Sequence, residues 1–137
     1  MNILDISFTK IHGEKHNVPK GNIKVANGIN IANLEKSNMG VGGDRQPLTV
    51  EFTFKSQYKP DIADIELKGK VLFIETQEEA KKTLETWEEN KNLGEQKTKN
   101  ILNKIMDKCN LDILLLSREL SLPSPVKPMN FKSKKQE

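Results

Sequence analysis

The sequence predicts an α+β fold in which a four-stranded antiparallel sheet is followed by two C-terminal helices. Residues 3–75 alternate apolar and polar side chains in four runs, whereas residues 77–120 repeat apolar residues every three or four positions. Strands grouped before helices are typical of a sheet with helices on one face. A chain of 137 residues suits one domain. We therefore expect a single domain over 1–137 that ends in an extended tail over 121–137.

Each of the four runs has the period of two that belongs to a strand with one solvated face. The expected strands cover residues 3–11, 22–34, 48–55 and 64–74. In the third run, which is the clearest, polar residues separate Leu48, Val50, Phe52 and Phe54.

Turn residues mark the connections between these runs. Residues 12–19 are polar and end in a proline, which predicts a loop, and residues 37–47 form a longer glycine-rich connection. Tyr58–Asp61 contains a Pro-Asp pair, which predicts a turn because proline fixes φ and aspartate bonds its own backbone. Gly28 lies inside the second run and indicates a bulge or a close backbone approach there.

Two helices follow the strands. Thr76 and Glu79 have the spacing of a capping box at a helix start, and residues 92–94 (Asn-Leu-Gly) break that helix. The first helix has a narrow apolar stripe of Ala80, Leu84 and Trp87. The second, from about 95 to 120, has a longer stripe of Ile101, Ile105, Cys109, Ile113, Leu116 and Leu120.

Some apolar residues exceed what this core needs. The second helix is apolar all round at 113–116, and Leu72 and Ile74 add apolar side chains to the second face of the fourth strand. Two helices cannot cover both faces of four strands, so we expect these residues to bind a polypeptide or to form an oligomer interface. For residues 113–116 we favour the interface. The candidate residues are Leu72, Ile74, Trp87, Leu93, Met106, Leu114 and Leu115.

The residue types that carry catalysis or metal binding are scattered. His12 and His16 lie in the expected loop, and the glycine-rich segment 40–45 lacks the Gly-Lys-Ser/Thr ending of a phosphate-binding loop. Cys109, the only cysteine, falls on the apolar stripe of a helix, which indicates a core residue. We therefore expect no enzyme activity, no metal site and no cofactor.

Composition restricts the partners and the compartment. The net charge of +3 is too small, and the aromatic content of 5% too low, to favour nucleic-acid binding. One cysteine suits a reducing compartment. The sequence shows neither a signal-peptide pattern nor an apolar run near the roughly 20 residues of a membrane span. We expect a cytoplasmic protein without membrane insertion.

Three segments together resemble the SecB family of export and holdase chaperones. Leu4–Phe8 is similar to the Asp-Ile-Ser-Phe that opens the first strand of many members. Asn110–Glu119 is similar, with one inserted position, to Asn-Ile-Leu-Phe-Pro-Tyr-Ala-Arg-Glu, and Leu122–Phe131 resembles Leu-x-Pro-Val-Asn-Phe. The order of strands, helices and proline-rich tail also agrees.

The resemblance implies a homotetramer, a dimer of dimers, that holds unfolded polypeptides in hydrophobic grooves without ATP. Its client would be an export preprotein or an antitoxin. Classical SecB proteins are strongly acidic and dock to the SecA motor, whereas this chain is basic and has three lysines in Lys132–Lys135. These charges argue against SecA docking.

Three hypotheses follow. The leading one is a holdase chaperone for non-native polypeptides. The alternative is a structural or adaptor subunit that binds one folded partner. The third is a nucleic-acid module built on the lysine-rich edges and tail, which requires binding that falls steeply with salt.

Overall fold

The computed structural model describes residues 1–38 and 43–123 and consists of four long strands followed by two helices. This confirms the predicted fold class. Residues 39–42 and 124–137 lie outside the described residues. The expected glycine-rich connection and the expected extended tail fall partly on these residues. The elements are β1 (Asn2–Lys15), β2 (Lys24–Lys36), β3 (Arg45–Lys59), β4 (Ala63–Thr76), α1 (Gln77–Asn90) and α2 (Glu95–Glu119).

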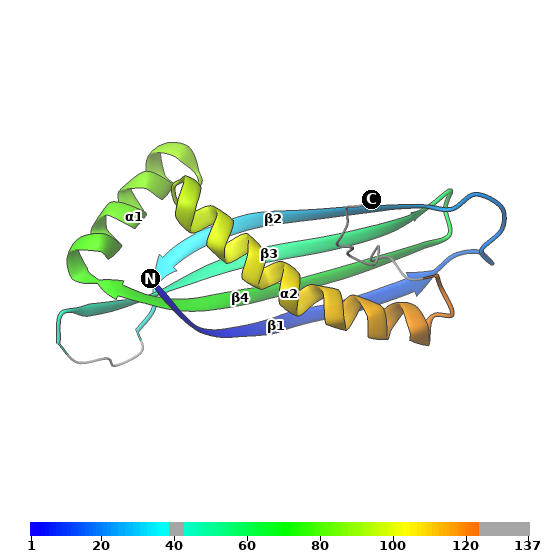
Figure 1. Ribbon diagram of the computed structural model, residues 1–137, viewed down its shortest axis with the longest axis horizontal. Coiled ribbons are helices and arrows are strands. Elements are labelled where there is room, and N and C mark those ends of the chain that lie inside the picture. The colour runs from blue at the N-terminus through cyan, green and yellow to red at the C-terminus, as the bar shows by residue number, and fades with distance from the viewer. Residues whose placement is uncertain (39–42, 124–137) are drawn as a thin grey trace, which may run out of the picture.

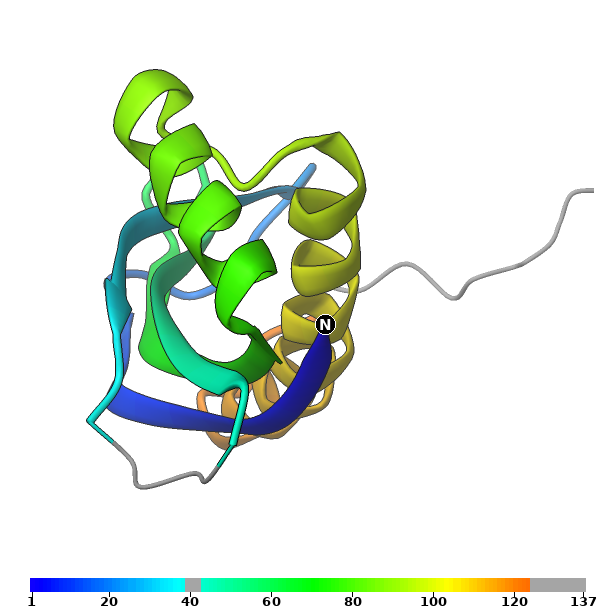
Figure 2. The same ribbon diagram turned by 90° about the vertical axis from the view of Figure 1, so that its left-hand side faces the viewer.

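The strands form one antiparallel sheet in the order β1-β4-β3-β2, so β1 and β2 are its edges. Figure 1 shows a long, narrow sheet with both helices on the same face, and Figure 2 shows this layering from the end. α1 packs over β2, β3 and β4 at one end of the sheet, and α2 packs on β4 and β1. We call the covered side the helix face and the other side the outer face.

The alternation along β3 and β4 sorts side chains between these faces, because successive side chains of a strand point to opposite sides. On β3, Leu48 and Val50 are fully buried against the helices, whereas Thr49 and Glu51 lie on the outer face. The rest of the central core on the helix face comprises Phe52, Phe54, Tyr58, Ile65, Leu67, Val71 and Phe73.

Gly69 of β4 provides room for this packing. A Cβ at this position would collide with the backbone oxygen of Ser7 and would lie 2.7 Å from Cζ of Phe52. The Phe52 ring in turn meets Phe8 of β1 edge-on, with 6.3 Å between the ring centroids. Because Gly69 has no side chain, the backbone of β1 and the Phe8–Phe52 pair can pack directly against β4 at this position.

Two local expectations are wrong. Residues 12–15 continue β1 rather than forming a loop, because their backbone pairs with β4 as far as Lys15 opposite Ala63. Gly28 pairs regularly with Lys55, and the bulge of β2 lies between Ile31 and Asn33. The bulge has a physical cause: Ile31 and Leu34 are three residues apart, and one extra residue keeps both on the helix face.

Capping interactions set the helix ends. The backbone N–H of Glu79 donates to Thr76 Oγ1 at 3.2 Å, as the capping pattern predicts. α1 ends where Lys91 adopts a left-handed conformation at φ 56° and donates to the Trp87 carbonyl at 2.8 Å. α2 ends before Pro123, with the N–H of Leu122 bonded to the Ser117 carbonyl at 2.8 Å. Neither described helix has the length and apolarity needed to cross a bilayer.

A buried ion pair joins both helices to the sheet. Glu75, at the end of β4, has a side chain only 1% exposed, and Lys97 of α2 reaches its carboxylate at 2.6 Å. Thr83 of α1 donates to the same carboxylate at 2.7 Å and accepts from Lys97 at 2.7 Å. The three groups satisfy one another where solvent is excluded, and they fix where α2 begins relative to α1.

Candidate functional site

The helix face remains partly open along β2. Four apolar side chains of this region, Ile23, Val25, Ile29 and Ile31, pack against the core but stay partly accessible. The cause is the direction of α2, which runs from the end of α1 diagonally over β4 towards β1 (Figure 1) and so leaves β2. We call these four residues the β2 row.

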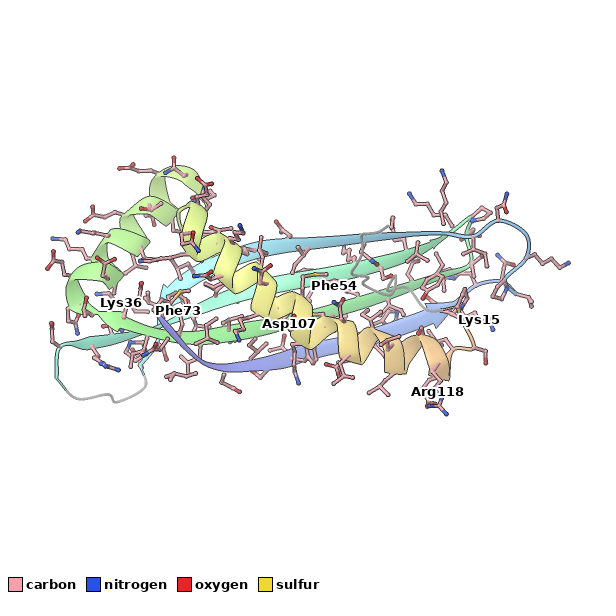
Figure 3. The ribbon with its side chains drawn as sticks, in the orientation of Figure 1. Lys15, Lys36, Phe54, Phe73, Asp107 and Arg118 are labelled. Carbon is pink, nitrogen blue, oxygen red and sulfur yellow. The ribbon has the colours of Figure 1, made fainter. Side chains whose placement is uncertain are left out.

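A cavity beside α1 lies at the end of β2, where Lys36 lines it. It has a volume of about 620 Å³. Its floor contains buried Ala80 and half-buried Leu84, and its rim is formed by Lys36, Gln77, Lys81, Glu85, Glu88 and Glu89. Lys36 pairs with Leu48 and therefore shares the helix face with the β2 row. Figure 3 places Lys36 next to the first turns of α1. We call this cavity the α1 groove.

The outer edge of β2 completes the arrangement. Among the described strands, β2 pairs only with β3, so it is an edge strand of the sheet, and edge strands are where another chain can pair. An extended polypeptide can hydrogen-bond to such an edge while alternate side chains enter neighbouring apolar pockets. β1, the opposite edge, is less regular, with irregularities between Ile3 and Asp5 and between Phe8 and Lys10.

None of the seven residues predicted as the site lines the α1 groove or belongs to the β2 row. Trp87 and Leu93 are 7% and 3% exposed and belong to the core. Leu72 and Ile74 lie on the outer face, where Ile74 is buried between the paired positions of β1 and β3. Met106 is half-buried against the core.

The remaining two, Leu114 and Leu115, are on the solvent side of α2. They are 41% and 54% exposed, and Leu111 beside them is 62% exposed. We call Leu111, Leu114 and Leu115 the α2 leucine patch. Leu111 was not predicted, although its spacing of four from Leu115 places both on one side of a helix. The β2 row was not predicted either, because its residues follow the same alternation as the buried core.

The pKa values of Cys109 and His16 are both raised in the structure. Burial raises the pKa of the Cys109 thiol to about 12. A hydrogen bond of 2.9 Å to Asp64 raises the pKa of His16. Both groups lie away from the α1 groove. Among residues 1–38 and 43–123, no three His, Cys, Asp or Glu side chains are placed to hold a metal ion.

A four-stranded antiparallel sheet followed by two helices is consistent with the SecB-like fold of a solved structure that resembles this chain. That structure is described as the Mycobacterium tuberculosis Rv1957 SecB-like chaperone in complex with a ChAD peptide from the Rv1956 HigA1 antitoxin. It matches with a TM-score of 0.58 at 11% identity, over 96% of this chain and 91% of that chain. No family model and no curated protein matches the sequence. The SecB-like fold, first suggested by three short segments, is confirmed at the level of structure.

Proposed function

We propose that this chain is an ATP-independent holdase chaperone that binds non-native polypeptides. The observation that carries the proposal is that the partly accessible β2 row lies on the edge strand β2, at whose end Lys36 lines the α1 groove. The edge suits any extended backbone. The apolar row suits any sequence that offers hydrophobic side chains at intervals.

The size of this surface fits weak and adaptable binding. Burying one large apolar side chain contributes about 1.5–3 kcal/mol, and ordering a flexible client opposes part of that gain. Three or four such contacts contribute about 4.5–12 kcal/mol before that cost, so we expect an affinity no tighter than roughly micromolar, near −8 kcal/mol. This suits a protein that must release its client without nucleotide hydrolysis.

The client we favour is an antitoxin-like or preprotein segment in the cytoplasm. The support is the antitoxin peptide bound to the similar Mycobacterium tuberculosis chaperone. The outer face gives no reason to add SecA as a partner. Its carboxylates are interspersed with lysines, as in the ion pairs of Glu66 with Lys10 at 2.8 Å and with Lys55 at 3.8 Å.

We also propose that the protein is a homo-oligomer, a dimer of dimers. The α2 leucine patch exposes three large apolar side chains on a rigid helix, and β1 is the second edge strand of the described sheet. Both features favour contact with another subunit. Light scattering coupled to size-exclusion chromatography tests this directly, and a monomer at micromolar concentration would contradict it.

The experiment for the main proposal is suppression of aggregation by the purified chain, without nucleotide, at a stoichiometric ratio to several thermally unfolded proteins. The account expects protection of most of them. The rigid α2 leucine patch also suits the alternative, an adaptor for one folded partner. An adaptor would give one dominant partner in a pull-down and no general protection.

A further inference from the structure

We propose that the C-terminal segment of this chain, residues 124–137, binds along the β2 row and in the α1 groove and so competes with clients. This inference rests on the proposed function, since it concerns the same surface.

The described chain ends at a fixed point on the helix face. The carbonyl of Pro123 accepts a hydrogen bond of 2.7 Å from the Tyr58 hydroxyl, and Leu122 is buried in the core. Tyr58 pairs with Val25, the first β2 residue of the β2 row. The next 14 residues therefore start beside one end of the proposed binding surface.

The distances allow the segment to reach the other end. Tyr58 and Leu48, the partner of Lys36 at the α1 groove, are ten residues apart on β3, or about 34 Å at a strand rise of ~3.4 Å. An extended chain spans at most ~3.3–3.6 Å per residue. Lys132 and Lys135 follow Pro123 by nine and twelve residues, and so reach to about 30–43 Å from it.

The chemistry of the segment follows the same order as the surface. Val126, Met129 and Phe131 come first and would pass the apolar β2 row. The basic run Lys132–Lys135 comes next and would arrive at the rim of the α1 groove, where the carboxylates Glu85, Glu88 and Glu89 outnumber Lys36 and Lys81. If the segment runs straight along β2, its apolar residues contact the β2 row and its lysines approach the carboxylates of the α1 groove.

A tethered segment competes even when its own affinity is weak. Short flexible tethers give effective concentrations in the millimolar range. A segment with a dissociation constant near 1 mM would then occupy the surface for about half of the time or more. Removing it should strengthen the apparent client affinity roughly two- to tenfold.

The test uses the full chain, a variant that ends at Pro123, and a fluorescent peptide of residues 124–137. The client probe is reduced, carboxymethylated lactalbumin. We expect the peptide to bind the shortened protein with an affinity that falls with salt, and the shortened protein to bind lactalbumin more tightly than the full chain does. Circular dichroism establishes that the shortened protein is folded.

Charge variants locate the contact. The pair Glu85→Lys and Glu88→Lys should weaken peptide binding at least fivefold, about the effect of two surface ion pairs near 0.5 kcal/mol each. The control pair, Asp5→Lys and Glu14→Lys, makes the same charge change at exposed positions on the outer face and should bind the peptide nearly as well as the unchanged protein.

Three results would overturn the inference: no peptide binding at 1 mM, equal weakening by both charge pairs, or equal lactalbumin affinities of the full and shortened chains. If both chains fail to bind lactalbumin, it is the proposed function that fails. The outcome of the peptide titration is independent of that failure.

Discussion

The buried ion pair between Glu75 and Lys97 gives the sharpest prediction about stability. Lys97→Met keeps the aliphatic stem but removes the charge that lies 2.6 Å from the Glu75 carboxylate. That carboxylate is 1% exposed, so it would be left as an unpaired charge out of reach of water. Breaking a buried pair in this way costs roughly 3–5 kcal/mol. Lys97 itself is 24% exposed, so we expect a cost at or just below the lower limit of that range, about 2–3 kcal/mol.

A double-mutant cycle isolates this effect. Glu75→Gln removes the charge and keeps an oxygen that accepts the hydrogen bond from Thr83, which is 2.7 Å from the carboxylate. In that background Lys97→Met should cost less than about 1 kcal/mol, a coupling of the size that contacting residues show. Urea unfolding followed by circular dichroism measures all four proteins.

Lys82→Met is the matched control. Lys82 pairs with Glu78 at 3.7 Å and Glu79 at 3.9 Å on the exposed side of α1, and such surface pairs contribute at most about 0.5 kcal/mol. The reasoning would be refuted if Lys97→Met cost no more than Lys82→Met, or if its cost were the same with glutamate and with glutamine at position 75.

Three further predictions follow from burial and hydrogen bonding. Gly69→Ala should destabilise the fold by about 1–3 kcal/mol in urea unfolding, because its Cβ meets the Phe52 ring; an unchanged midpoint would contradict this packing. His16 should titrate above its ordinary pKa of 6.5 by NMR, and Asp64→Asn should remove the shift; the associated stability is complete below 6.5 and is lost as pH rises through the folded pKa. Cys109, with a pKa of about 12, should react with a thiol reagent only after unfolding; rapid labelling of the native protein would show that the thiol is accessible.

Hydrophobic periodicity was sufficient to predict the fold because the central strands and α2 follow their periods closely. Ile101, Ile105, Cys109 and Ile113, all on the predicted stripe, are buried. The sequence also contains a signal for the register shifts of β1 and β2: at each of them, two apolar residues are three positions apart instead of two. Ile3 and Ile6 flank an irregularity of β1 as Ile31 and Leu34 flank the bulge of β2. This spacing was a better signal than the glycine at position 28.

The candidate site was much less predictable. The alternation shows which side chains share a face, but which part of the face stays open depends on the direction in which α2 crosses the sheet. Val25 and Phe54 therefore follow the same pattern, although Val25 is half-buried and Phe54 is fully buried. Trp87 was predicted as surplus because α1 looked thinly apolar, whereas its side chain is part of the core. The exposure of Val25 and of Trp87 therefore depends on how the helices pack on the sheet, which the periodicity of the sequence does not show.

The most direct test of the central claim compares two substitutions at adjacent positions of β2. Ile29 belongs to the β2 row, whereas Asn30 pairs with Thr53 and points to the outer face. Fluorescence titration with reduced, carboxymethylated lactalbumin should show at least tenfold weaker binding for Ile29→Asp, the loss expected when one apolar contact of about 1.5–3 kcal/mol is removed. Asn30→Asp, with the same added charge, should bind as the unchanged chain does. Equal affinities of the two folded variants, or no binding by the unchanged chain, would contradict a client site on the helix face.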